Sequence, residues 1–346
     1  MPSTDPTSEP AAQGRTVRPA GGKSRQRGAE RAPLDLADDR RRLKNKLVPE
    51  YEVTPHFVRV DGGPWMHFVD EGNPAAPVLL CVHGNPSWSF HWRRLIDRFR
   101  FTHRVVAPDL IGCGFSEKPA DFDYRLARHI DSLETLVDEL GIERATLVVQ
   151  DWGGAIGLGL AARRPELVER LVILNSGAFR STRMPGRIAM GRVPFLGRLG
   201  IRGLGLFSRL ALMWAVERKR WTRAERRGYL LPYASWADRV AIQAFVDDIP
   251  MDPSHRSWND LVAIEESLSG LADRPTCIVW GARDWCFTTE FRDRYQQFFP
   301  AAEVHTIANA GHWVLEDAPE EVLNHIAAFL EAHPVEVAAA PGASGA

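Results

Sequence analysis

The chain has 346 residues, of which 45% are apolar, and its formal net charge is −1. This composition suffices for a full hydrophobic core, and the near-neutral charge gives no indication of a nucleic-acid partner. No apolar run reaches the roughly 18 residues that cross a bilayer, and the N-terminus lacks the apolar segment of a secretory signal, so a transmembrane or secreted protein is not expected.

The four cysteines form neither a CxxC pair nor the Cys and His spacing of a zinc site. Cys81 and Cys277 lie in apolar runs and are expected to be small buried side chains. We therefore expect a reduced, cytoplasmic protein that uses no metal and no cofactor.

Both ends of the chain differ in composition from its middle. Residues 1–45 are rich in Pro, Gly, Ser and Arg and poor in large apolar residues, so they predict a disordered leader. The run RRRLKNK, residues 40–46, is a weak indication of a nucleic-acid or membrane contact, since it is short and stands alone. Residues 335–346 predict a disordered tail.

From residue 64 onward, short apolar segments alternate with segments of helical periodicity. The apolar segments predict strands at 78–83, 104–110, 145–150, 170–176, 275–281 and 303–309. Helices are predicted at 126–140, 153–164, 289–299 and 319–332. Because the strands are apolar at consecutive positions, the sheet should be buried on both faces and therefore mostly parallel. The alternation predicts an α/β fold with helices on both faces of the sheet.

The stretch LVVQDWGGAIGLGLA, residues 147–161, has the form of a nucleophile elbow, the sharp turn from a strand to a helix that lifts one side chain out of the sheet. The residue at the turn is usually a serine, but here it is Asp151. Serine attacks a carbonyl carbon, whereas a carboxylate is already ionised and suits displacement at saturated carbon, which forms an ester. The motif therefore predicts an α/β-hydrolase fold whose nucleophile is an aspartate.

The loop HGNP, residues 83–86, follows the first predicted strand. In this fold that loop and the residue after the nucleophile each supply a backbone N–H to an oxyanion hole, so Asn85 and Trp152 are predicted to do so. Their side chains add an amide and an indole N–H, and both could bind a small anion near Asp151.

The alternation stops between residues 178 and 270, where many arginines occur with the aromatic residues Trp214, Trp221, Tyr229, Tyr233, Trp236 and Trp258. We interpret this stretch as an inserted helical cap, with residues 46–177 and 271–334 forming the hydrolase core. A cap at the carboxyl ends of parallel strands covers the usual place of the active site. Its aromatic residues and apolar stretches such as AIQAFV, residues 241–246, are expected to line a cavity for alkyl chains.

Two further residues complete a triad in the chain order nucleophile, acid, histidine. Asp284 follows the strand predicted at 275–281, and His312 follows the strand predicted at 303–309. Asp284 is predicted to orient His312, which is predicted to act as a base. Three such residues, each after its own strand, are a far more specific signal than a single loop aspartate or histidine.

The segments VQDWGG, HGNPSWSFHWR, PDLIGCGFSEKP and AGHWVLED resemble the haloalkane dehalogenases, over residues 50–332. The resemblance implies that Asp151 is the nucleophile, His312 the base, and Asn85 and Trp152 the pair that holds the halide. That family places its third acid after the sixth or the seventh sheet strand. Residues 175–176 are Asn and Ser, so the role passes to Asp284, as in the third subfamily.

That subfamily also resembles the β-lactone decarboxylases of bacterial long-chain olefin biosynthesis, which convert a cis-β-lactone into an alkene and carbonate. Residues 216–250 are more similar to that group than to proven haloalkane dehalogenases. The resemblance therefore implies a β-lactone decarboxylase, with a haloalkane dehalogenase as the alternative. The implied partner is a small hydrophobic substrate, and other enzymes of the olefin pathway or a homo-oligomer stay open.

Two other functions compete with these. Epoxide hydrolases also use an elbow aspartate, but they need cap tyrosines as acids, for which Tyr229 and Tyr233 are available. They usually carry an aromatic residue in place of Asn85. A non-catalytic binding protein of this fold is disfavoured, because such proteins commonly lose triad members and this chain has all three.

Overall fold

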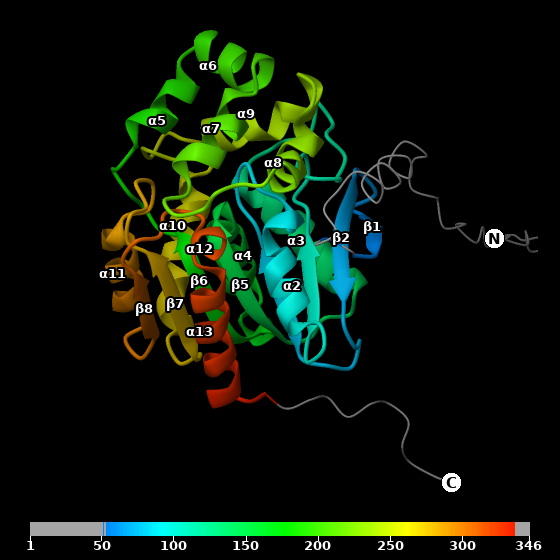
Figure 1. The fold of residues 1–346 in the computed structure, drawn as a ribbon, viewed down its shortest axis with the longest axis vertical. Helices are drawn as coiled ribbons and strands as arrows, with labels where there is room; N and C mark the ends of the chain where they lie inside the picture. The colour runs from blue at the N-terminus through cyan, green and yellow to red at the C-terminus, as the bar shows by residue number, and fades with distance from the viewer. Residues whose placement is uncertain (1–50, 52, 336–346) are drawn as a thin grey trace, which may run out of the picture.

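An eight-stranded sheet forms the centre of the molecule (Figure 1). The computed structural model describes residue 51 and residues 53–335, so the predicted leader and all of the predicted tail except Val335 lie outside the described residues. In chain order the strands are β1 (Pro55–Arg59), β2 (Trp65–Glu71), β3 (Val78–Val82), β4 (Arg104–Pro108), β5 (Ala145–Asp151), β6 (Val168–Ser176), β7 (Thr276–Gly281) and β8 (Glu303–Ile307). This arrangement confirms the predicted α/β-hydrolase fold.

The strand order is β1-β2-β4-β3-β5-β6-β7-β8. The six strands from β3 to β8 run parallel, and they are the six that the apolar segments predict. The sequence does not predict β1 and β2, which pair antiparallel at one edge. β1 has only one fully buried residue, Val58, so this edge strand lacks the continuous apolar run by which the others are identified.

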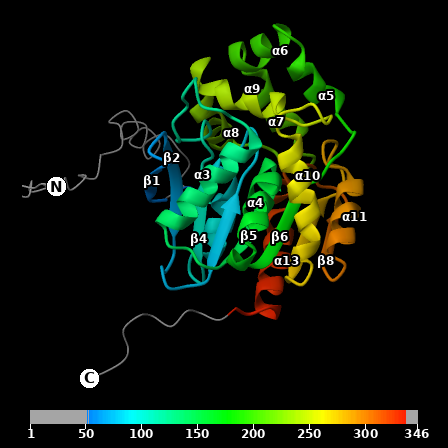
Figure 2. The ribbon, with the colours of Figure 1, turned by 180° about the vertical axis from the view of Figure 1, so that it is seen from behind.

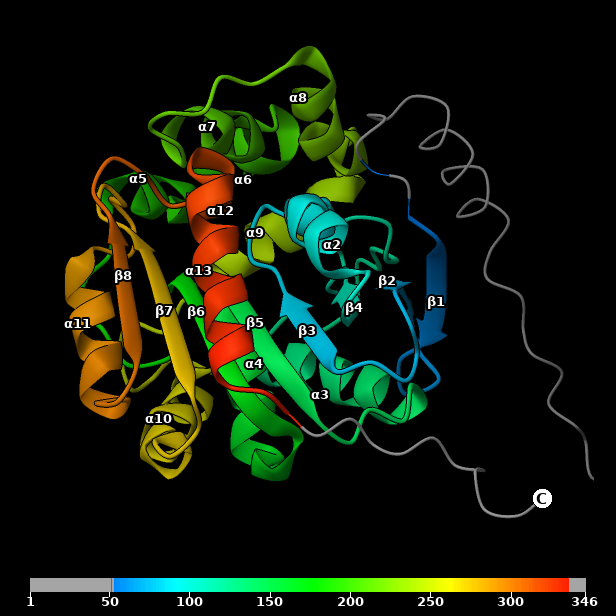
Figure 3. The same cartoon turned by 60° about the horizontal axis from the view of Figure 1, so that its bottom comes forward.

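Helices cover both faces of the sheet (Figures 1 and 3). They are α2 (Arg93–Phe99), α3 (Leu126–Glu139), α4 (Trp152–Arg163), α10 (Trp258–Ser267), α11 (Thr289–Phe298), α12 (Val314–Asp317) and α13 (Pro319–Ala332), with the short turns η1 (Ser89–Trp92), η2 (Pro165–Leu167) and η7 (Leu268–Leu271). Alternate residues of β3 face opposite layers: Leu80 and Val82 pack with α3 and α4, whereas Leu79 and Cys81 pack with α2 and α13. The sheet thus separates two apolar cores.

All the elements between β6 and β7 are helical, and most of them lie over the carboxyl ends of the strands (Figure 2). They are α5 (Gly186–Ala189), η3 (Met190–Arg192), α6 (Leu196–Arg198), the π-helical turn η4 (Leu199–Gly203), α7 (Leu206–Trp214), α8 (Arg223–Leu230), η5 (Leu231–Tyr233), η6 (Ala237–Arg239) and α9 (Val240–Asp247). The last long helix of this stretch, α10, lies beside α4, where Leu261 and Ile264 join the core. The cap boundary at residue 270 therefore stays a prediction, and α10 packs with the sheet layer. No helix within the described residues is long and apolar enough to span a membrane.

A buried charged cluster joins the cap to the core. The Arg93 guanidinium binds the Glu316 carboxylate with both terminal nitrogens, at 2.9 Å for Nη2 to Oε2, and their side chains are 1% and 0% exposed. The Tyr229 hydroxyl of α8 donates to Glu316 at 2.7 Å. Glu225, also of α8, accepts from Lys219 at 2.5 Å and lies 3.3 Å from Arg93. Burial acts to raise the pKa of Glu316, but the Arg93 charge and hydrogen bonds outweigh it and lower that pKa.

We predict that Arg93→Met destabilises the protein by about 3–5 kcal/mol, because it leaves the Glu316 carboxylate buried without its cation. The measurement is the free energy of unfolding from urea titration at neutral pH. Arg163→Met is the matched control, since Arg163 pairs with Asp131 and Glu134 only through partly exposed side chains, and its loss should cost about 1 kcal/mol or less. An equal loss of unfolding free energy in the two variants would show that the buried pair of Arg93 and Glu316 does not stabilise the contact between cap and core.

Candidate active site

β5 ends in a strained turn that projects the Asp151 side chain above the sheet. The register with β6 shifts between Gln150 and Asp151, and Asp151 has φ 54° and ψ −131°, a conformation that a side chain disfavours. A Cβ on Gly153 would lie 2.0 Å from the Val82 carbonyl oxygen, so only glycine permits α4 to start this close to β3. This geometry is the elbow that the sequence predicts.

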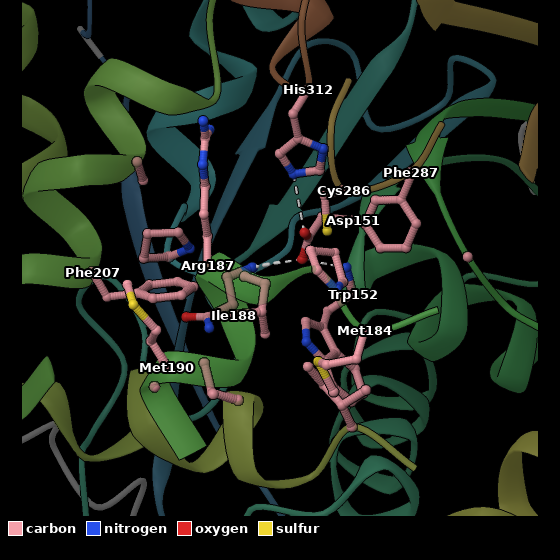
Figure 4. Close-up of a pocket in the computed structure, with 18 of the residues that line it drawn as sticks. Asp151, Trp152, Met184, Arg187, Ile188, Met190, Phe207, Cys286, Phe287 and His312 are labelled. Atoms are coloured by element: carbon pink, nitrogen blue, oxygen red, sulfur yellow. Dashed lines mark hydrogen bonds and ion pairs between the residues drawn. The ribbon is translucent and has the colours of Figure 1, made fainter. Parts of the chain in front are cut away.

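The two carboxylate oxygens of Asp151 have different partners (Figure 4). Oδ1 accepts from the backbone N–H groups of Asn85, at 3.0 Å, and Trp152, at 2.5 Å. Oδ2 lies 3.0 Å from Nε2 of His312. The loop after β3 and the start of α4 therefore hold one oxygen in an oxyanion site and leave the other beside the histidine.

His312 is held from its other side by Asp284. Its Nδ1 lies 2.8 Å from Oδ2 of Asp284. The second Asp284 oxygen accepts from the backbone N–H of Cys286 at 2.7 Å. The structure thus brings together Asp151, Asp284 and His312, from the ends of β5, β7 and β8, within hydrogen-bonding distance.

Two residues of this network were not predicted as site residues. Asn175 donates to Oδ2 of Asp284 at 3.0 Å and accepts from the Gly281 N–H at 2.8 Å, so an amide at the end of β6 anchors the acid at the end of β7. Nε2 of Gln150 lies 3.2 Å from Nε2 of His312 and donates to its backbone carbonyl at 3.3 Å. In the sequence, the one indication of a role for Gln150 and Asn175 is that each is a polar side chain within an otherwise apolar strand.

The charge of His312 follows from its surroundings. Burial acts to lower the pKa of the imidazole, but the carboxylates of Asp284 and Asp151 outweigh this effect and raise it to about 10. The ring is therefore an imidazolium at neutral pH. Because folding raises the pKa of His312, binding of a proton to this ring stabilises the folded protein. This stabilisation is fully present below the ordinary pKa of a histidine and is lost as the pH rises toward about 10.

The side chains of Asn85 and Trp152, which we call the donor pair, both border the cavity above Asp151. The Asn85 amide donates to the Ile242 carbonyl of α9 at 3.2 Å, so one of its two N–H groups is bound to the cap. The Trp152 ring packs on Phe245, with ring centroids 5.3 Å apart. That the donor pair binds an anion stays a prediction.

The cavity has a volume of about 460 Å³, and Asp151, His312, Asn85, Arg183 and Arg187 are the main polar residues that line it. Its apolar wall includes Phe179, Met184, Ile188, Met190, Leu206, Phe207, Leu210, Trp214, Val246, Leu261, Trp285 and Phe287. Figure 4 labels five of them: Met184, Ile188, Met190, Phe207 and Phe287. A cavity of this size and character suits a small apolar ligand, since such sites span roughly 300–1,000 Å³.

The expectation that the cap aromatics line this cavity is largely wrong. Of the six predicted, only Trp214 lines it, and of the stretch 241–246 only Val246 does. Tyr229 is bound to Glu316, and the Tyr233 hydroxyl donates to the Ser87 carbonyl at 3.1 Å. Most of the cap's share of the wall comes instead from residues 183–214, because the aromatic side chains of α8 and η5 are used to pack the cap on the core.

The model of the alpha/beta hydrolase fold family matches residues 77–199 and 204–319. A cis-3-alkyl-4-alkyloxetan-2-one decarboxylase of Shewanella oneidensis is 43% identical, over 80% of this chain and 87% of its own. Another of that name, from Xanthomonas campestris, is 40% identical, over 83% of this chain and 99% of its own.

A haloalkane dehalogenase of Mycobacterium marinum is 32% identical, over 80% of this chain and 93% of its own. The crystal structure of a haloalkane dehalogenase from Bradyrhizobium elkani is similar with a TM-score of 0.75 and 28% identity, covering 81% of this chain and 98% of that one.

We predict that Asp284→Asn lowers the pKa of His312 well below about 10, because it removes the carboxylate on Nδ1 and leaves burial less opposed. The measurement is a histidine titration by NMR between pH 5 and pH 10, with His312→Gln used to assign the signal. Glu320→Gln, an exposed change on α13, is the control and should leave the titration unchanged. An unshifted His312 signal in Asp284→Asn would mean that Asp284 does not set its charge.

Proposed function

The chain belongs to the alpha/beta hydrolase fold family and, within it, to the haloalkane dehalogenase-like enzymes, and from this premise we propose that it decarboxylates cis-3-alkyl-4-alkyloxetan-2-ones, which are β-lactones with two alkyl substituents. The observation that carries this proposal is a carboxylate side chain, that of Asp151, in the wall of a largely apolar cavity of about 460 Å³. The higher identity to decarboxylases than to dehalogenases supports the choice between the two reactions.

The first step is attack at saturated carbon. Oδ2 of Asp151 displaces the ring oxygen at C4 of the lactone, which inverts that carbon and forms an ester with the enzyme. The ring opening relieves the strain of the four-membered ring and releases a carboxylate on C3. In this proposal the donor pair, which lines the cavity, stabilises the developing anion, and the apolar wall receives the alkyl chains.

The second step is an elimination that needs no water. The bond from C3 to the carboxylate carbon breaks, its electrons form the C3–C4 double bond, and the C4–Oδ2 bond breaks. Carbon dioxide leaves, and it hydrates to carbonate in solution. Asp151 recovers its negative charge. Inversion in the first step followed by anti elimination converts a cis lactone into a cis alkene.

The charge of His312 supports this sequence of steps. A ring that is an imidazolium at neutral pH is no base, and neither step consumes a proton. Its Nε2 lies 3.0 Å from Oδ2, the oxygen that regains a negative charge as the alkene forms. His312 thus stabilises the departing carboxylate, Asp284 holds the ring through Nδ1, and Gln150 donates to the backbone carbonyl of His312.

Hydrolysis of a haloalkane is the second candidate, and the position of Oδ1 is the observation that favours it. Water attack on the Asp151 ester would place negative charge on Oδ1, which already accepts from two backbone N–H groups. Esterification would also remove the charge of Asp151, one of the two carboxylates that raise the pKa of His312, so the ring would become a better base in the intermediate.

Epoxide hydrolysis lacks its acids in this arrangement. Within the described part of the chain, neither Tyr229 nor Tyr233 lines the cavity, because both hydroxyls are bound at the contact of cap and core. Binding without catalysis is disfavoured because the three triad side chains are joined by hydrogen bonds.

We predict that the two reactions leave different isotope patterns in Asp151. After a single turnover of 1-bromohexane in water enriched in heavy oxygen, one carboxyl oxygen of Asp151 should carry label, because water attacks the ester carbon. After a single turnover of a long-chain cis-β-lactone, Asp151 should carry none, because elimination breaks the C4–Oδ2 bond. The measurement is mass spectrometry of the peptide that contains Asp151.

Asp151→Ala is the control for both substrates and should form neither adduct nor product. Label in Asp151 after lactone turnover would overturn the elimination step. In that case the expected product is the β-hydroxy acid, which the same sample would show.

A further inference from the structure

The outer surface of the cap exposes an unusual number of large apolar side chains. Within the described residues, the exposed large apolar side chains are Phe101, Met190, Val193, Phe195, Leu196, Leu199, Leu204, Leu206, Met213 and Trp236. All but Phe101 belong to the cap, and Phe195 and Leu196 are 88% and 70% exposed. We call the eight residues from Met190 to Met213 in this list the apolar cap surface. It lies on η3, α6, η4, α7 and the short connections between them, at the end of the molecule farthest from the amino ends of the strands (Figures 1 and 2).

Large apolar side chains that are exposed together within one short segment indicate an interaction site, since a folded chain otherwise buries most such residues. Trp236, the remaining exposed cap residue, is covered in part by the Arg202 guanidinium, 4.8 Å from its ring centroid. The apolar cap surface therefore needs a partner other than the rest of the described chain.

The charge of this segment is strongly one-sided. Residues 177–216 contain seven arginines, no lysine and no acidic residue, in a chain whose net charge is −1. Arg198 and Arg209 are exposed and lie among the apolar residues, on α6 and α7. Arginines interleaved with apolar side chains suit the boundary between anionic headgroups and acyl chains, where both kinds of group are accommodated at once.

The apolar cap surface continues into the cavity that contains Asp151. Met190, Val193, Leu196 and Leu206 are exposed and also line the cavity. An apolar molecule that reaches this surface therefore meets the same side chains at the cavity wall. This continuity distinguishes the surface from a patch that merely contacts another protein.

We propose that the apolar cap surface docks on an anionic lipid bilayer, with the arginines at the headgroups and Phe195, Leu199 and Leu204 in the acyl boundary. The cavity then opens toward the membrane. The docking proposal depends only on the exposed apolar side chains and the arginines of the cap. The further step, in which a dialkyl β-lactone passes from the bilayer to Asp151, rests on the proposed function. A second copy of the chain is a poorer occupant, because a symmetric contact would place two arginine-rich surfaces face to face.

The test is co-sedimentation of the full chain with phosphatidylcholine vesicles that contain or lack phosphatidylglycerol, at low and high salt. The wild type should bind the anionic vesicles, and added salt should weaken this binding. Arg198→Glu/Arg209→Glu should lower the partition coefficient at least tenfold, because each cation near such a surface contributes about 1 kcal/mol and each reversal adds repulsion. Phe195→Ser/Leu199→Ser should lower it as well. None of these four residues lines the cavity.

Two control variants make the same kinds of substitution in the full chain, but far from the apolar cap surface. Phe101→Ser removes a side chain that is 82% exposed, and Arg144→Glu reverses a charge just before β5, both at the end of the sheet opposite the cap. Both should bind vesicles as the wild type does. Equal binding of the cap variants and the wild type, or no preference of the wild type for phosphatidylglycerol, would overturn the proposal.

Two further readouts separate the alternatives. Light scattering of the same samples without vesicles tests self-association, and a change from oligomer to monomer in the cap variants, with vesicle binding unchanged, would assign the surface to a second copy instead. Turnover of a short, water-soluble β-lactone should be the same in the cap variants and the wild type. If the wild type lacks this turnover but binds vesicles, the proposed function fails and the docking proposal stands.

Discussion

The two oxygens of the Asp151 carboxylate have different hydrogen-bond partners, and the rest of the site depends on this constraint. Oδ1 of Asp151 is bound by two backbone N–H groups, and Oδ2 is left 3.0 Å from His312. This requires the loop after β3 to meet the start of α4, which is where the sheet order reverses between β3 and β5. It also requires glycine at position 153 and a strained backbone at Asp151, whose cost the packing of β5 and α4 offsets.

The electrostatic consequence is a histidine between two carboxylates. Such a ring is cationic at neutral pH, so the resting site is suited to a reaction in which a carboxylate attacks and later departs. Hydrolysis through the same intermediate requires the ring to lose its proton after Asp151 is esterified. One geometry can therefore support both reactions, and the shape of the apolar cavity, rather than the triad, has to separate their substrates.

The sequence predicts the parts of the site that follow directly from strand order. Asp151, Asp284 and His312 each follow an apolar strand of a parallel sheet, so their proximity is a consequence of the fold. Gln150 and Asn175 stand out only as polar side chains within apolar strands, and their roles depend on contacts between different strands, which a local pattern does not reveal. β1 escapes prediction because an edge strand needs no continuous apolar run. The sequence predicts the wrong cap residues for the cavity wall, because packing decides whether Tyr229 and Tyr233 face the cavity or the core.

The most direct test of the central claim, that Asp151 opens a β-lactone in this apolar cavity and releases an alkene, is a comparison of kcat/KM for a long-chain cis-3,4-dialkyl β-lactone and for 1-bromohexane. Gas chromatography would follow the alkene and ion chromatography the bromide. We expect a cis alkene as the product and a kcat/KM for the lactone that is higher by at least two orders of magnitude, or about 2.7 kcal/mol in transition-state stabilisation. Rapid release of bromide without any alkene from the lactone would contradict the claim and identify a haloalkane dehalogenase.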